Sequence, residues 1–180
     1  PAQYVEVRCM PGDKTPFGER YYQPDEPGGP LPPDARISLN LCMADIKAAV
    51  IAQLRAGVQV TFGSDVAKLS SKPRGLMDTD LFHYEELFGT ELWMDSPDSY
   101  AYHWSSGTHI MCFDGVELDA AGAPVRWKVQ NSYGAGMGIQ GHYVMADRWF
   151  DQFVVSAALR RDFLPAHVLP WLDKEPRPLE

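Results

Sequence analysis

Hydrophobic and polar residues alternate along much of the second half of the chain, the pattern of strands with one buried face. The clearest alternation covers residues 125–130, where valine and tryptophan are separated by charged and amide side chains. Residues 109–118, 142–145 and 153–159 are apolar runs of strand length, and residues 119–122 between the first run and the alternating segment predict a tight turn. The sequence therefore predicts a largely antiparallel sheet in this half.

A helix is expected before this sheet, over residues 41–56. Asn40 is its expected N-cap, and Gly57 is the glycine that typically ends a helix. A strand over 58–62 and a short helical segment over 147–152 complete the expected elements. The apolar face of the long helix is predicted from side chains that recur at gaps of three and four, namely Met43, Ile46, Val50 and Leu54.

Proline and glycine set the expected limits of the folded part. Residues 1–36, of which 4–7 could form a strand, are interpreted as an extended Pro/Gly-rich arm that lies on a neighbouring molecule instead of forming a core, with a disordered tail as the alternative. Residues 37–164 are the expected domain, and residues 165–180 a Pro-rich tail. The predicted fold class is α+β.

The composition and charge limit the classes of protein to which this chain can belong. The 180 residues, 45% of them hydrophobic and 22% charged, fit one ordinary domain with a core. A net charge of −8 speaks against binding to nucleic acids or anionic membranes, and no apolar run approaches the roughly 20 residues of a membrane span. The first residues lack the charged and apolar regions of a secretory signal, and three widely spaced cysteines make no disulfide framework, so we expect a cytoplasmic protein.

Two residues carry the candidate chemistry. His109 opens one expected strand and Asn131 follows the next, so a hairpin would bring both side chains to one edge of the sheet. An amide that accepts a hydrogen bond from one ring nitrogen leaves the other nitrogen facing a cleft. Tyr133 would cover that bond, and Gly134 begins a mobile, glycine-rich loop that leaves the cleft open. The alternative is a buried histidine and a turn asparagine, each satisfied locally.

None of the three cysteines is a convincing nucleophile. Cys42 lies near a helix start, where a thiol pKa is lowered, but a small buried residue is the preferred interpretation. Cys112 is an odd number of residues from His109 on one strand, so the two side chains face opposite ways, and Cys112 is expected in the core. Cys9 has no base nearby in sequence. The histidines have no metal-ligand spacing, and no metal or cofactor is expected.

The chain resembles the carboxy-terminal part of the bleomycin hydrolase and aminopeptidase C family of papain-like cysteine peptidases. The resemblance rests on residues 60–66, 108–111, 127–134 and 141–150. It implies the carboxy-terminal antiparallel β-sheet half of a papain-like fold, with a flanking helix. It also implies that the parent protein is a cysteine aminopeptidase, which hydrolyses peptide bonds at free amino ends, or similar small amides, without a cofactor.

By the same resemblance His109 is the catalytic imidazole, Asn131 is its orienting amide, and Tyr133 and Gly134 support them. Tyr133 takes the place of the more usual tryptophan. No stretch matches the family's Gln-Gly-x-Cys-Trp nucleophile segment, so the chain alone is expected to be inactive and to need an N-terminal half that carries the cysteine. Family members form homo-oligomers, including hexamers. A non-catalytic binding or assembly module that retains the peptidase scaffold is the alternative.

Overall fold

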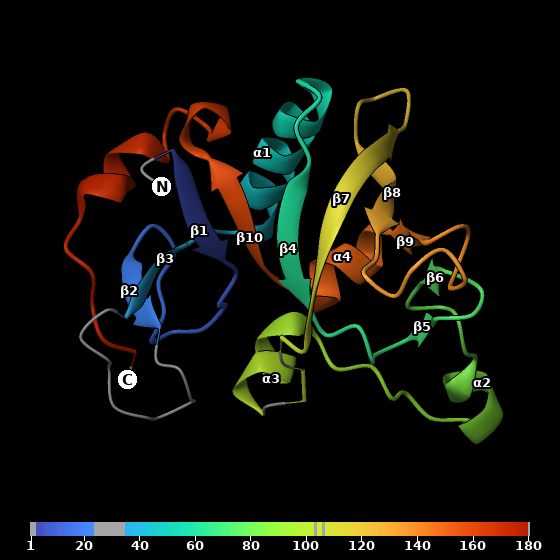
Figure 1. The fold of residues 1–180 in the computed structure, drawn as a ribbon. Coiled ribbons are helices and arrows are strands. Elements are labelled where there is room, and N and C mark those ends of the chain that lie inside the picture. The colour runs from blue at the N-terminus through green and yellow to red at the C-terminus, as the bar shows by residue number, and fades with distance from the viewer. Residues whose placement is uncertain (1–2, 24–34, 103, 106, 180) are drawn as a thin grey trace.

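The computed structural model describes residues 3–23, 35–102, 104–105 and 107–179, and in these residues one mixed sheet crosses the molecule (Figure 1). Its strand order is β2-β3-β1-β10-β4-β7-β8-β9-β6-β5. Neighbouring strands are antiparallel except for β1 with β3 and β6 with β9. The strands are β1 (Tyr4–Arg8), β2 (Arg20–Gln23), β3 (Arg36–Asn40), β4 (Val60–Ser64), β5 (Ser70–Ser71), β6 (Leu76–Met77), β7 (His109–Leu118), β8 (Pro124–Gln130), β9 (His142–Ala146) and β10 (Val154–Arg160).

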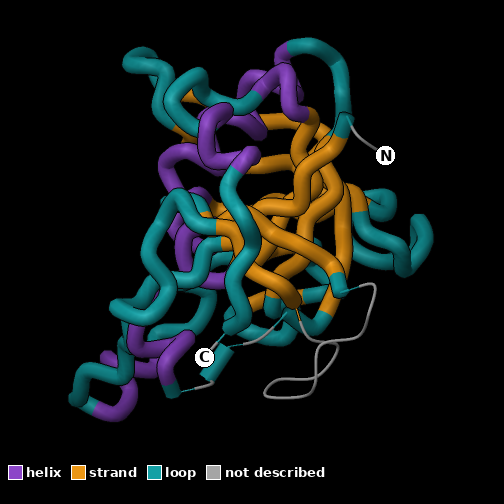
Figure 2. The backbone as a smooth tube through the Cα atoms, turned by 90° about the vertical axis from the view of Figure 1, so that its left-hand side faces the viewer, coloured by secondary structure: helices purple, strands orange, loops and turns teal. Residues whose placement is uncertain are grey.

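The helices lie mainly to one side of the strands, as the turned view shows (Figure 2). Two of them supply the helical part of the core: α1 packs against β4, β7 and β10, and α4 against β8, β9 and β10. The helices are α1 (Met43–Arg55), α2 (Tyr84–Phe88), α3 (Ser96–Ala101) and α4 (Asp147–Phe153), followed by 3₁₀ turns at Arg161–Phe163 and Leu169–Asp173.

Aromatic side chains fill the middle of the core. Phe113 of β7 stacks on Phe62 of β4, with ring centroids 3.8 Å apart, and on Phe150 of α4 at 5.0 Å. Trp127 of β8 lies 4.7 Å from Phe150. All four side chains are almost completely buried, so the strands and α4 are held together by one aromatic cluster.

Two ion pairs made by one lysine join the two core helices. Lys47 of α1 contacts Asp147 Oδ2 at 2.7 Å and Asp151 Oδ1 at 2.6 Å, both on α4. Trp127 Nε1 donates to Asp147 Oδ1 at 3.0 Å. Asp147 therefore links both helices to β8, which fixes the strand that ends at the candidate site.

The sheet predicted for the second half is confirmed, with β7, β8 and β9 paired antiparallel in the expected order. The α+β class is confirmed as well. The long helix has bounds of Met43–Arg55, slightly shorter than predicted, and Gly57 follows it with a positive φ of 75°.

The interpretation of residues 1–36 as an arm outside the core is wrong for the part that the structure describes. β1 lies between β10 and β3 inside the sheet, and Val7 and Tyr21 are buried. Both pairings of β1 join residues far apart in sequence, so the local pattern gives no sign of them. Residues 24–34, the most Pro-rich part of the expected arm, lie outside the described residues.

Two further local predictions differ from the structure. Asn40 is not the N-cap of α1; Cys42 occupies that position without a side-chain cap. The Asn40 side chain accepts from Met10 N–H at 2.8 Å and donates to Thr15 O at 2.7 Å, which secures the chain after β1. The expected C-terminal tail is partly packed, since Arg177 exchanges backbone hydrogen bonds with β2.

Candidate active site

The register of β7 and β8 brings His109 and Asn131 together. His109 is the first residue of β7 and pairs with Ser64 at the end of β4. Cys112 pairs with Gln130, the last residue of β8, so Asn131 leaves the sheet at the edge where β7 begins. The two side chains thus meet beside the start of β7, at the lower end of this strand in Figure 1.

The imidazole and the carboxamide are hydrogen-bonded. His109 Nε2 lies 3.0 Å from Asn131 Oδ1, and Ser132 N–H donates to the same oxygen at 2.7 Å. A backbone N–H can only donate, so the oxygen of Asn131 must face Ser132 and His109. The proton of the His109–Asn131 bond therefore sits on Nε2, and a neutral ring carries its lone pair on Nδ1.

Nδ1 is the ring nitrogen that stays without a partner in the part of the chain that the structure describes. Among the described residues, no hydrogen bond or ion pair uses it, and the His109 side chain is half-buried. A neutral imidazole held in one tautomer, with its basic nitrogen unoccupied, can accept a proton from a thiol and return it to a leaving group.

Tyr133 covers this pair on one side. Its ring stacks on His109 with centroids 4.8 Å apart and planes 16° from parallel, and Lys72 Nζ lies 5.3 Å from the Tyr133 ring centroid. Tyr133 is 43% exposed, so it shields the hydrogen bond only partly. Gly134 follows with a φ of 79°, a conformation that glycine adopts without strain, and turns the chain into the loop before β9.

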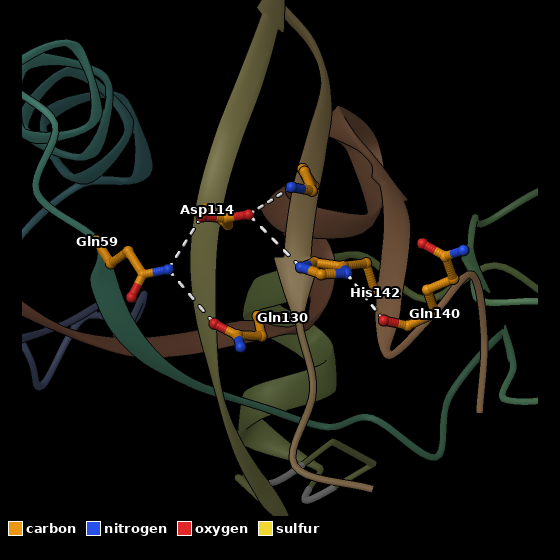
Figure 3. A network of polar contacts seen from close by, with 6 residues as sticks. Gln59, Asp114, Gln130, Gln140 and His142 are labelled. Atoms are coloured by element: carbon orange, nitrogen blue, oxygen red, sulfur yellow. Dashed lines mark hydrogen bonds and ion pairs between the residues drawn. The ribbon is translucent and has the colours of Figure 1, made fainter. Parts of the chain in front are cut away.

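A polar network on the other face of the same strands holds their register (Figure 3). Asp114 of β7 accepts from Lys128 Nζ at 2.6 Å and from Gln59 Nε2 at 2.9 Å, and lies 3.6 Å from His142 Nε2. The hydrogen bond from Lys128 is the largest cause that lowers the pKa of Asp114, followed by that from Gln59. The network spans from the start of β4 to β9 and so braces the strands that carry His109 and Asn131.

The structure places none of the three cysteines against His109 Nδ1. Cys112 is half-buried, not in the core as expected, and its sulfur lies 3.7 Å from Thr61 Oγ1. Cys42 at the N-cap of α1 donates to Asp45 Oδ2 at 3.4 Å. Burial raises the pKa of Cys9 to about 12, which keeps that thiol protonated at neutral pH.

The described residues contain no group of three His, Cys, Asp or Glu side chains placed to hold a metal ion. None of the helices in the same part of the chain combines the length and apolar character needed to cross a membrane.

Three contacts of the site were not predicted from the sequence. They are the Ser132 N–H bond to Asn131, the approach of Lys72 to Tyr133, and the position of Tyr143 beside Asn131. The alternation in 142–145 places Tyr143 on a buried face, but only the pairing of β9 with β8 shows which residues it approaches.

The fold and this His–Asn geometry define a papain-like peptidase scaffold, and the chain belongs to the Peptidase C1-like family, which it matches over residues 3–180. It is 33% identical to the aminopeptidase C of Streptococcus thermophilus over 178 residues, covering 99% of this chain and 40% of the relative. It is 39% identical to the aminopeptidase C of Lactobacillus delbrueckii subsp. lactis over 130 residues, covering 72% and 29%.

Among solved structures, PepW from Lactobacillus rhamnosis HN001 matches 99% of this chain with a TM-score of 0.89 and 33% identity, and this match covers 40% of PepW. The chain thus spans about 40% of the length of these full-coverage relatives. That share is consistent with the carboxy-terminal part of the family that the sequence motifs predict.

Proposed function

We propose that this chain is the carboxy-terminal part of a bleomycin hydrolase-like cysteine aminopeptidase, in which it supplies His109 and Asn131. A segment outside this sequence supplies the nucleophilic thiol. The observation that carries the proposal is the hydrogen bond between His109 Nε2 and Asn131 Oδ1, whose direction the Ser132 N–H fixes. It leaves Nδ1 as the basic nitrogen of the ring.

The reaction follows from that arrangement. Nδ1 of His109 takes the proton of the incoming thiol, and the thiolate attacks the carbonyl carbon of the scissile amide. The imidazolium then protonates the leaving amine as the carbon–nitrogen bond breaks. In the second step Nδ1 takes a proton from water as the water oxygen attacks the thioester carbon. The carbon–sulfur bond then breaks, which releases the acid and returns the thiolate beside the imidazolium. Asn131 holds the Nε2–H side of the ring throughout.

The substrate class comes from the relatives. They are named aminopeptidases, so the proposed substrates are peptides with a free amino end, or small amides of similar shape. No cofactor takes part in this chemistry. The proposal extends to a homo-oligomer, with a hexamer as the family's assembly, and to a cytoplasmic location, which the three free thiols suit.

Exposed apolar side chains support a covering partner near the site. Residues 82–102 include α2 and α3, which lie toward the same lower end of the molecule as the start of β7 (Figure 1). Large apolar side chains that stay exposed in such number often contact another chain or segment. We assign the missing cysteine-bearing half as the occupant. The exposed residues are Phe82, Tyr84, Leu87, Phe88, Leu92, Trp93 and Tyr102.

The test joins this chain to the upstream part of the S. thermophilus aminopeptidase C in one polypeptide and measures release of a fluorophore from an aminoacyl substrate. We expect activity from the fused protein, none from the 180-residue chain alone, and loss of activity with His109→Ala. His167→Ala is the matched control, because that histidine pairs with Asp45 away from the site. A folded but inactive fusion would favour the non-catalytic module, and activity of the chain alone would contradict the proposal.

A further inference from the structure

Two buried polar atoms near the site, the amide nitrogen Nδ2 of Asn131 and the phenol oxygen Oη of Tyr143, lack a hydrogen-bond partner among the described residues. The oxygen of this amide is fully used by His109 and Ser132, so its nitrogen remains the group that still needs a partner. Burying an unpaired donor and an unpaired acceptor costs free energy at both atoms, and pairing them removes both costs.

Strand register places the two groups within reach of each other. Tyr143 of β9 pairs with Val129 of β8, and Asn131 N–H donates to Gly141 O at 3.0 Å. Asn131 and Tyr143 are therefore diagonal neighbours on the same face of an antiparallel pair, a separation that a tyrosine side chain can span. Burial raises the pKa of Tyr143, and the nearby Asn131 side chain acts in the opposite direction.

The tyrosine ring is clamped by glycines. A Cβ atom at Gly138 would lie 2.6 Å from two carbons of the Tyr143 ring, and one at Gly75 would lie 2.9 Å from the Gly138 Cα. Only glycine permits this close stacking of β6, the loop and the ring. Tyr143 has no exposed surface. Because its ring is tightly packed, its hydroxyl group has little freedom to move.

We infer that Tyr143 is a positioning residue: its hydroxyl oxygen accepts a hydrogen bond from Asn131 Nδ2 and so sets the plane of the carboxamide that orients His109. This inference deepens the proposed function and rests on the role of Asn131 in it. Asn131 is then held at both ends, with its oxygen between Ser132 and His109 and its nitrogen on Tyr143.

The test replaces the hydroxyl alone, with Tyr143→Phe, and follows the Asn131 side-chain amide and the His109 ring nitrogens of the 180-residue chain by NMR. We expect the Asn131 Nδ2 protons to exchange with water about 2- to 10-fold faster, as for loss of one modest hydrogen bond. We also expect a smaller fraction of the His109 tautomer with the proton on Nε2. Tyr21→Phe is the matched control, because Tyr21 is a second buried tyrosine whose hydroxyl lacks a partner in the described residues, and it lies in β2.

Changes in Tyr143→Phe that Tyr21→Phe does not share support the inference. Equal changes in both variants, or none in either, would overturn it. In the unsubstituted chain, a nuclear Overhauser effect between the Tyr143 hydroxyl and the Asn131 Nδ2 protons is required, and its absence would also overturn the inference without any variant. These measurements need no catalysis, so an inactive fusion protein would reject the proposed function and leave them unchanged.

Discussion

Gly138 offers a sharp test of how the loop before β9 is built. The sequence predicts a mobile glycine-rich loop that leaves space for a cleft, whereas the structure packs Gly138 tightly against its neighbours. A Cβ atom there would lie 2.5 Å from the carbonyl oxygen of His142 and 2.6 Å from the Tyr143 ring, at a φ of 65°. Gly134 in the same loop also has a positive φ, of 79°, but a Cβ there would meet nothing within 4 Å. Gly138→Ala and Gly134→Ala therefore differ mainly in packing.

The expected loss of stability in each variant has a backbone part and a packing part. Alanine in the left-handed region loses about 1–2 kcal/mol at either position. At Gly138 the obstructing atoms are a backbone oxygen and a buried ring, which cannot move aside as the end of a flexible side chain would. Overpacking adds about 1–3 kcal/mol there, so we expect Gly138→Ala to lower the free energy of unfolding by about 2–5 kcal/mol. Gly134→Ala should lose only about 1–2 kcal/mol.

Urea unfolding followed by tryptophan fluorescence measures both variants. Their unfolding midpoints should differ while the dependence on urea concentration stays the same, because the surface exposed on unfolding is unchanged. Equal losses of stability in the two variants would refute the close packing of the loop on Tyr143. That result would favour the mobile loop predicted from the sequence and would contradict the tight packing that fixes the position of Tyr143.

Three other outcomes are expected. Asn131→Ala should lower kcat of the fused enzyme about 10- to 150-fold, the factor for one hydrogen bond to a charged ring; an unchanged kcat would exclude an orienting role. Asp114→Asn should lower stability by about 0.2–1 kcal/mol at pH 7. The folded pKa of Asp114 is depressed, so this difference should shrink below about pH 4, as unfolding at the two pH values would show. Cys9, with a pKa of about 12, should resist iodoacetamide at pH 8 until urea unfolds the chain, as mass spectrometry would detect.

The sequence predicts elements whose signal is local. The alternation around Trp127 gives β8, and the apolar residues at gaps of three and four give α1. The positions of His109 at a strand start and Asn131 at a strand end also follow from these patterns, because an antiparallel hairpin returns the chain to the same edge. Their hydrogen bond is the geometric consequence.

Features that depend on pairing between distant segments cannot be predicted from the local sequence pattern. β1 is short and is flanked by proline and glycine, but its backbone groups are satisfied by β10 and β3, more than 25 residues away in each case. Asparagine is a common N-cap residue, but the Asn40 side chain hydrogen-bonds the chain after β1 and does not cap the helix. Tyr143 shows the same limit in the site, since the diagonal contact with Asn131 exists only once β8 and β9 are in register.

The contacts that orient His109 and Asn131 lie within this chain. The Asn131 oxygen is fixed by a backbone N–H of the adjacent residue, and the His109 ring is stacked on Tyr133, two residues beyond Asn131. None of these contacts requires another chain, so the neutral tautomer of His109 is set before any nucleophile arrives. Orientation established in advance reduces the ordering that must accompany the reaction. Under the proposed function, an upstream half that docks on the exposed apolar residues has to place only a thiol against Nδ1 and donors around the carbonyl oxygen, because the His109 ring is already oriented.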